Sequence, residues 1–338
     1  MKKLLNLCLC ACFLFILMSF VGQPASAQEK TITMKFSCQF PSMHKVALLK
    51  AEWCKEVEKR TNGRVKIDFF PGAILTPPAQ TYDSVLKGIA DVGESFCGYT
   101  KGRFPLMEVV DLPLGYKSGY QSTKLTNEFY HKFKPKEFDN VQVMFFHTAG
   151  PQDMCTKKPV NKMEDLKGMK IRATGTSAQI VMALGAAPVG MSMGEAYDAI
   201  SRGVANGVVC PVEATKGWKL ADVVSSCTMY NSRHTNVAYV VMNKKKWNAI
   251  PKDAQQIIEK INEEYIEKQG KLWDELDKEA LEFFTQKGGK MITVSKEEDG
   301  KFKTALQPIL DEYVKSMKAK GLPGAEALKF CQDYVKAH

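Results

Sequence analysis

Beyond residue 30, hydrophobic positions recur first at a period of two and then at a period of three to four residues. Thr31 to Ser37 alternates polar and apolar side chains, as a strand with one buried face does. Ser42 to Arg60 carries its apolar residues on one helical face, and Thr61-Asn62-Gly63 ends that helix. The pattern then predicts a strand, a helix and a strand, at Val65 to Phe70, after Pro77-Pro78 and at Ala90 to Phe96. This β-α-β-α-β order predicts a parallel sheet with crossover helices.

A second series of elements begins near Asp153, after a strand at Val141 to His147. Ser192 and Glu195 have the spacing of a capping box, which predicts a helix that runs to Arg202. A strand, a helix and a strand in this order form a βαβ unit. Its loops lie at the carboxyl ends of the strands, where ligands usually bind. The strands predicted here are at 154–156, around Arg172, at 204–210 and at Val237 to Asn243.

Asp253 to Gln286 has apolar residues at steps of three and four and predicts one long helix, which Gly288-Gly289 ends. At 1.5 Å per residue it would span ~50 Å, more than the width of one small domain. A coiled coil is the alternative. Because the segment occurs once, we expect a helix that lies across two lobes.

The first 27 residues have the pattern of a secretory signal peptide. Lys2 and Lys3 precede an apolar run from Leu4 to Val21, and Ala25-Ser26-Ala27 is a small-x-small cleavage site. The mature chain is expected to begin near Gln28 and to be periplasmic. A retained membrane anchor is the alternative, since the apolar run is long enough to span a bilayer.

Composition narrows the class of protein. A chain of 338 residues with 45% hydrophobic content is expected to form two domains. The net charge of +10 is scattered, and no arginine-rich stripe with aromatic residues occurs, so we expect no nucleic-acid partner. Of the ten cysteines, three lie in the first 27 residues. The remaining seven leave room for a disulfide, with partners undetermined, and for at least one free thiol.

No motif for catalysis, a cofactor or a metal stands out. The chain has no phosphate-binding loop, no Gly-x-Gly-x-x-Gly after a strand and no His-Glu-x-x-His. Gly93-Glu94-Ser95 begins like a nucleophile elbow, but Cys97 stands where the closing glycine belongs. We therefore expect a binding protein, not an enzyme, with no catalytic residue, no cofactor and no metal site.

Arg172 is the only cation between Ile171 and Ser201, in a run of apolar and small residues. A guanidinium stays charged and its planar fork pairs with a carboxylate through two hydrogen bonds. Spacing alone leaves two interpretations open. Arg172 binds an anionic ligand, or it forms an internal ion pair with Glu195 or Asp198.

Five segments, in order, resemble one family of bacterial receptors. Asp165-Leu-Lys-Gly-Met-Lys-Ile-Arg172, Pro188 to Tyr197 and Arg202 to Gly207 are similar to the periplasmic solute receptors of tripartite ATP-independent (TRAP) transporters, of the dicarboxylate-receptor type. Ala90-Asp91-Val92-Gly93 and Val241-Met242-Asn243 match as well. The resemblance implies two α/β lobes of the periplasmic binding protein type with a central cleft, several hinge crossings and a long helix that spans both lobes.

The expected lobe boundaries follow from the strand order and this resemblance. We expect residues 28–149 together with 238–277 to form lobe I, and residues 150–237 together with 278–338 to form lobe II. The resemblance also implies a membrane permease as partner. We expect the receptor to be a monomer.

Within the resemblance, the arginine of the Lys-Gly-x-Lys-x-Arg strand holds the carboxylate of the ligand, and here it is Arg172. Many relatives have a second cationic or polar residue about 20 positions earlier, where this chain has Gln152. Trp218 is expected to pack inside a helix. The other candidates for ligand contact are Phe96, Tyr99, Met193, Cys210, Asn236 and Gln39.

One fixed cation with an aromatic and sulfur-rich wall suits a monocarboxylate with an apolar or aromatic body, such as an aryl, indole or keto acid. An amide at Gln152 cannot neutralise a second negative charge. The alternatives are a four-carbon dicarboxylate or a sugar acid as ligand, and a sensory receptor in place of a transport component.

Overall fold

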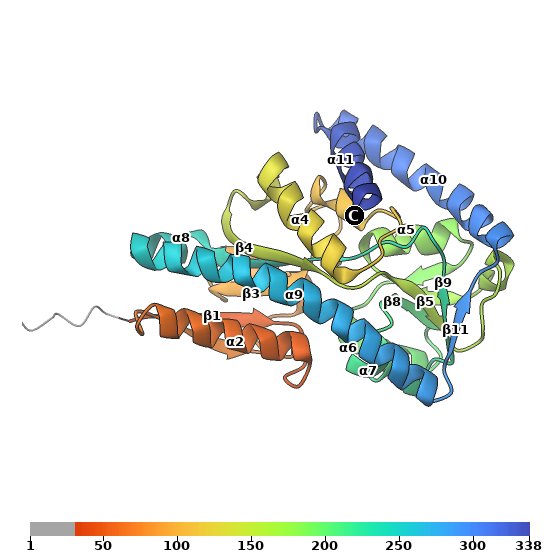
Figure 1. Ribbon diagram of the computed structural model, residues 1–338, viewed down its shortest axis with the longest axis horizontal. Helices are drawn as coiled ribbons and strands as arrows, with labels where there is room; N and C mark the ends of the chain where they lie inside the picture. The colour runs from red at the N-terminus through yellow and green to blue at the C-terminus, as the bar shows by residue number, and fades with distance from the viewer. Residues whose placement is uncertain (1–30) are drawn as a thin grey trace, which may run out of the picture. The chain divides into compact units, whose positions relative to one another are not determined.

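The computed structural model describes residues 31–338, and in them the chain forms two mixed sheets covered by helices (Figure 1). The expected signal peptide lies outside the described residues. In the described part, no helix is both long and apolar enough to cross a membrane.

The first sheet has the strand order β2-β1-β3-β10-β4. β1 is parallel to β2 and β3, which confirms the parallel arrangement predicted for the first three strands. β10 is antiparallel to both β3 and β4, so it enters the sheet from the opposite direction. The strands are β1 (Ile32–Cys38), β2 (Val65–Phe70), β3 (Val92–Phe96), β4 (Val141–Thr148) and β10 (Val237–Asn243).

The second sheet has the order β11-β9-β5-β8-β6-β7. β6 is parallel to β7 and β8, whereas β5 is antiparallel to β8 and β9. The strands are β5 (Asp153–Thr156), β6 (Lys170–Arg172), β7 (Ala187–Val189), β8 (Gly207–Cys210), β9 (Ser226–Met229) and β11 (Lys290–Thr293).

The chain passes between the two sheets three times. It crosses from β4 to β5 at residues 149–152, returns from β9 to β10 at residues 230–236, and crosses again through the helix before β11. The helices are α2 (Lys45–Arg60), α3 (Thr81–Leu86), α4 (Gly119–Phe133), α5 (Gly175–Ala183), α6 (Met193–Ser201), α7 (Ala214–Gly217), α8 (Lys244–Ala249), α9 (Lys252–Gln286), α10 (Lys296–Ala319) and α11 (Gly324–Ala337).

The long helix predicted at 253–286 is α9, with 35 residues. Its first part packs on β4 of the first sheet and on α2 and α4, which cover that sheet. It then continues to α7 and β11 at the second sheet (Figure 1). The expectation that this helix lies across both lobes is thereby met. Farther along, α10 packs on α5, but α11 packs on α4, so the C-terminal helices contact both halves. The lobe boundaries stay a prediction.

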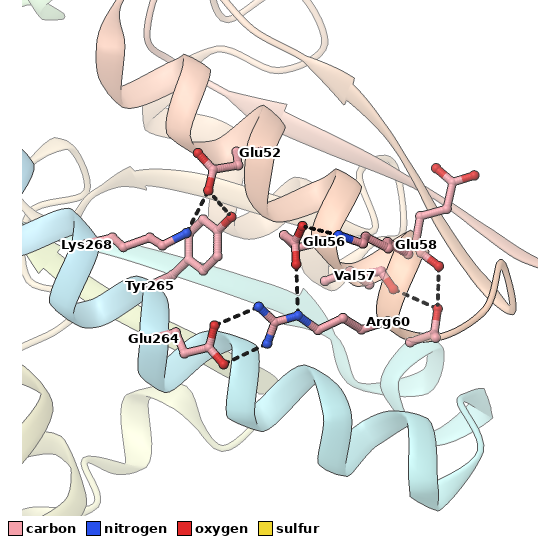
Figure 2. A network of polar contacts seen from close by, with 10 residues as sticks. Glu52, Glu56, Val57, Glu58, Arg60, Glu264, Tyr265 and Lys268 are labelled. Atoms are coloured by element: carbon pink, nitrogen blue, oxygen red, sulfur yellow. Dashed lines mark hydrogen bonds and ion pairs between the residues drawn. The ribbon is translucent and has the colours of Figure 1, made fainter.

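Figure 2 shows how charged side chains join α9 to α2 on the surface. Arg60 donates from Nη1 and Nη2 to the two carboxylate oxygens of Glu264, at 2.7 and 2.8 Å. Tyr265 and Lys268 both donate to Oε1 of Glu52, at 2.9 and 2.7 Å. Exposed ion pairs contribute little, about 0–1 kcal/mol each. The apolar layer beneath them, which includes the buried Trp53, therefore dominates the stability of this contact.

One disulfide links the second sheet. Cys155 of β5 and Cys227 of β9 lie opposite each other in the antiparallel ladder and are bonded. The sequence left the partners open, because the pairing depends on strand order. In residues 31–338, the other five cysteines are free and buried, which agrees with the expectation of at least one unpaired thiol.

Candidate functional site

A cavity lies where the carboxyl ends of strands from the two sheets face each other. Measured as the space that the centre of a water molecule can occupy, its volume is about 30 Å³, so the two walls lie close together. It is lined by Phe40, Phe96, Gly98, Tyr99, Ala149, Gln152, Arg172, Thr174, Met193, Pro211, Glu213, Ala214, Trp218, Asn236 and Trp273.

Arg172, the last residue of β6, is 3% exposed and is fixed by backbone contacts. Its Nε and Nη2 donate to the carbonyl of Met191 at 3.0 and 2.8 Å, and Nη2 also donates to the Tyr99 hydroxyl at 3.4 Å. The Nη1 group has no hydrogen bond within residues 31–338. The guanidinium is thus oriented by the Met191 carbonyl and the Tyr99 hydroxyl, and Nη1 remains a donor for another group.

The internal ion pair considered for Arg172 is not formed. Glu195 accepts from the backbone N–H and the hydroxyl of Ser192, at 2.9 and 2.6 Å, and these bonds lower the pKa of its carboxyl. Within the described part of the chain, neither Glu195 nor Asp198 forms an ion pair with Arg172. A buried charge without a partner is costly. The arrangement is therefore suited to an anion that enters the cavity.

The Tyr99 hydroxyl is a second donor beside Arg172. Its oxygen accepts from the N–H of Met193 at 3.1 Å and from Arg172, so the hydroxyl hydrogen is free for another acceptor. The Arg172 guanidinium also lies 6.0 Å from the centre of the Tyr99 ring. Tyr99 follows β3, whereas Met193 begins α6, so this hydroxyl joins the two sides of the cavity.

Two amide side chains, Gln152 and Asn236, line the cavity where the chain crosses between the sheets. Gln152 donates to the carbonyl of Gly150 at 2.8 Å and accepts from Asn236 at 3.2 Å. Asn236 accepts in turn from Ser177, whose hydroxyl lies 2.7 Å from Nε2 of His234. Two of the three amides predicted from the sequence therefore line the cavity, and they bond to each other across two chain crossings.

The rest of the wall is aromatic. Phe40 lies 6.1 Å from Phe96, 5.9 Å from Trp218 and 6.1 Å from Trp273, measured between ring centres. Trp218 follows the short α7 and packs against two apolar clusters, as expected, and it also lines the cavity. Trp273 is on the buried face of α9, and the sequence could not separate such a residue from ordinary core packing.

A buried polar network supports this aromatic wall from behind. Trp273 donates to Nδ1 of His147 at 3.1 Å, and Nε2 of His147 lies 2.6 Å from Oε1 of Glu94. Lys50 reaches the same Glu94 oxygen at 3.3 Å. Burial opposes the ionisation of Glu94, but the Lys50 charge and the bond to His147 outweigh it and lower its pKa to about 2. Burial and the Lys50 charge lower the pKa of His147 to about 4, so this ring is neutral.

Two residues predicted from the sequence lie elsewhere. Cys210 is fully buried in β8, in the apolar cluster that contains Val208 and Leu220, and it is absent from the cavity lining. Gln39 follows β1 and is buried, but it is also outside the lining. Cys210 is outside the cavity because successive residues of β8 face opposite sides of the sheet, and Cys210 lies on the side of the apolar cluster.

Glu213 is a cavity residue that sequence reasoning missed. It follows β8, is 2% exposed, and its Oε1 lies 2.8 Å from Nε2 of His44. The sequence could have indicated this residue, because Glu213 follows a strand that ends at the cavity. Among residues 31–338, no group of three or more His, Cys, Asp or Glu side chains could hold a metal ion.

The fold and the cavity define a two-lobed solute-binding protein. Residues 38–316 match the family described as DctP, bacterial extracellular solute-binding protein, family 7. The chain belongs to this family, whose members are substrate-binding receptors of transporters and not enzymes. The family includes TRAP periplasmic receptors that bind small organic acids.

Three similar proteins illustrate the match. The outer membrane transporter protein TsaT of Comamonas testosteroni is 27% identical over 93% of this chain and 94% of its own. A TRAP solute-binding protein of Rhodoferax ferrireducens, solved with copurified benzoate, is 25% identical, with a TM-score of 0.85 over 91% of this chain and 98% of its own. A marine metagenome TRAP solute-binding protein specific for aromatic acids, solved with 3-hydroxybenzoate, is 27% identical, with a TM-score of 0.85 over 91% and 99%.

Proposed function

We propose that this protein captures a monocarboxylate with an aromatic or apolar body between its lobes and delivers it to the membrane permease of a TRAP transporter. The observation that carries the proposal is the buried Arg172 guanidinium, which has no carboxylate partner among the described residues and stands beside an aromatic wall. Arg172 Nη1 and the free hydrogen of Tyr99 would both donate to the ligand carboxylate. Charge-assisted bonds of this kind are strongest where water is excluded.

The charges of the cavity favour one carboxylate over two. Arg172 is the only Lys or Arg in its lining, and Gln152 and Asn236 are neutral. Glu213 adds a negative charge, which opposes a second anionic group. Four-carbon dicarboxylates and sugar acids are therefore the weaker candidates. The aromatic-acid complexes of the two similar structures support an aromatic ligand.

In this proposal, binding is coupled to closure of the lobes. The carboxylate pairs with Arg172 in lobe II, while Tyr99, Phe96 and Phe40 of lobe I cover the body of the ligand. A ligand that contacts both walls stabilises the closed form by its differential affinity for that form. The receptor would act in the periplasm, after removal of residues 1–27, as a monomer.

A ligand screen tests the proposal. Purified protein would be heated with benzoates, aryl acetates, indole acids, keto acids, succinate, malate and sugar acids, and the unfolding temperature followed. We expect aryl or related monocarboxylates to raise it most. Arg172→Ala should weaken binding of those acids by about 100-fold or more in calorimetry, because a charge-assisted pair is lost.

Arg202→Ala provides the matched control, since Arg202 is exposed at the end of α6 and outside the cavity lining. It should bind as the parent protein does. Stabilisation by succinate or malate alone would contradict the monocarboxylate assignment, and normal binding by Arg172→Ala would contradict the site itself.

A further inference from the structure

Glu213 stands at the boundary between the cavity and a groove on the outside of the molecule. It lines both, together with Trp218, whereas Arg172 lines only the cavity. The cation and the carboxylate therefore occupy different parts of one cavity, and the two do not form an ion pair within the described residues. The cavity has a donor end at Arg172 and an acceptor at its outer side.

Glu213 faces the His44 ring, and the three lysines of the groove, Lys45, Lys216 and Lys219, form no ion pair with it among residues 31–338. Nδ1 of His44 accepts from the N–H of Val46 at 3.2 Å, so a neutral His44 ring carries its hydrogen on Nε2, 2.8 Å from Oε1 of Glu213. That contact lacks the alignment of a hydrogen bond, and Glu213 Oε1 has no other donor in residues 31–338. In the same residues, no lysine or arginine pairs with Glu213.

A second acid, Asp277, lies beside Glu213. The backbone N–H of Glu213 donates to Oδ1 of Asp277 at 3.0 Å. Burial, with the nearby charge of Glu213 as a further contribution, raises the pKa of Asp277 well above its usual range. A buried carboxylate acceptor without aligned donors is costly, and nearly all buried polar groups in native proteins have a partner.

We infer that Glu213 accepts a hydrogen bond from the ligand, which therefore carries a hydroxyl or ammonium group on its apolar body, away from the carboxylate that Arg172 binds. This inference rests on the proposed function and specifies the ligand class further. A donor at that position satisfies Glu213, whereas an ether or a second carboxylate leaves it without a partner or repels it. Sites built around a ligand donor discriminate strongly against analogues that lack it.

The test compares ligands that differ in one hydrogen-bond donor. Affinities of benzoate, the three hydroxybenzoates and their methyl ethers would be measured by calorimetry for the parent protein, Glu213→Gln and Glu282→Gln. Glu282 lies exposed on α9 outside the cavity lining and is the matched acid-to-amide control. We expect the parent protein and the control to prefer one hydroxybenzoate over its methyl ether by about tenfold or more.

In Glu213→Gln this preference should fall to about threefold or less, while benzoate binds as in the parent protein. An unchanged preference in Glu213→Gln, or no preference in the parent protein, overturns the inference and leaves the proposed function intact. An equal loss for every ligand also overturns it, because Glu213 would then act only through its contact with His44. Failure of the parent protein to bind any of the acids overturns the proposed function and this inference together.

Discussion

Arg172 and Tyr99 meet across the cavity: Nη2 of Arg172 donates to the Tyr99 hydroxyl oxygen at 3.4 Å. Arg172 ends β6 of the second sheet, and Tyr99 lies three residues after β3 of the first sheet. The same oxygen accepts the N–H of Met193 at 3.1 Å. This hydroxyl therefore links the two lobes directly at the cation that we assign to the ligand.

Tyr99→Phe should weaken ligand binding while the fold is retained. The ring keeps its place against Phe96, at 6.0 Å between ring centres, but the cross-lobe hydrogen bonds and one donor to the ligand are lost. We expect the dissociation constant to rise about tenfold, equivalent to about 1.4 kcal/mol. Calorimetry with the best acid of the screen measures this change.

Tyr197→Phe serves as the comparison, since Tyr197 is 36% exposed on α6 and is not part of the cavity. It should bind as the parent protein does. Equal affinities for all three proteins would show that the Tyr99 hydroxyl contributes nothing to closure.

The backbones of Gly98, which follows β3, and Gly175, which begins α5, lie close together. A Cβ added to Gly175 would lie 2.7 Å from Cα of Gly98, whereas a Cβ added to Gly98 would have its nearest neighbour at 3.6 Å. Gly175 also has a φ of +54°, which favours glycine. Gly175→Ala should therefore hold the lobes apart and weaken ligand binding by about tenfold or more.

Gly300→Ala is the control for the same substitution, since Gly300 is exposed on α10, outside the cavity lining, and an added Cβ has no neighbour within 4 Å. It should bind within about threefold of the parent protein. Small-angle scattering with saturating ligand would report the closure of each variant. If Gly175→Ala closed and bound as well as Gly300→Ala does, the close approach would have no role in closure.

The long periodic segments were predictable because their buried faces are apolar. β2 and β10 have the predicted bounds, and α9 begins one residue before the predicted start. No helix was assigned where α4 lies, because the face that it buries is largely polar. Asn127 of α4, for example, donates to the carbonyl of Phe146 at 2.9 Å. The apolar residues at helical steps, Leu125, Phe129 and Phe133, are confined to the second half of this helix.

The site was predictable only in part, for a related reason. Arg172 stood out as a single cation in an apolar run, but spacing alone left an internal ion pair open, and only the family resemblance favoured a ligand contact. Six of the eight candidate residues line the cavity. Trp273 could not be found, since one periodic face of α9 both packs the core and reaches the cavity. Glu213 was missed because its role depends on residues far apart in the chain, such as His44.

Lys50→Met should destabilise the protein strongly. Lys50 and Glu94 are both fully buried, 3.3 Å apart, and without Lys50 the Glu94 carboxylate loses the largest contribution that favours its charged form. Removal of one partner of a buried ion pair costs about 3–5 kcal/mol. Urea unfolding at neutral pH measures the change in the free energy of unfolding.

Lys59→Met is the control for the same substitution on the same helix. Its side chain is 78% exposed and lies 3.7 Å from Glu56, so the free energy of unfolding should change by less than about 0.5 kcal/mol. If Lys50→Met proved as stable as Lys59→Met, the network behind Trp273 would not be a stabilising one.

His234 should make the protein less stable in mild acid. Burial lowers the pKa of this ring from 6.5 to about 3, so between these values the unfolded chain binds a proton that the folded protein excludes. Its contribution to stability is therefore present above pH 6.5 and is lost as the pH falls from 6.5 toward 3, by up to about 1.4 kcal/mol per pH unit. Urea unfolding between pH 7 and pH 5 measures the slope.

His234→Gln should flatten this slope, because glutamine does not titrate and can still bond to Ser177. Burial also raises the pKa of Asp153 to about 7, which gives the opposite slope: that contribution is present below pH 3.8 and is lost as the pH rises through 7. Asp153 is unchanged in the variant, so the difference between the two profiles isolates His234. Parallel profiles for the two proteins would show that the His234 ring binds its proton equally well in the folded and the unfolded chain, which would contradict the lowered pKa.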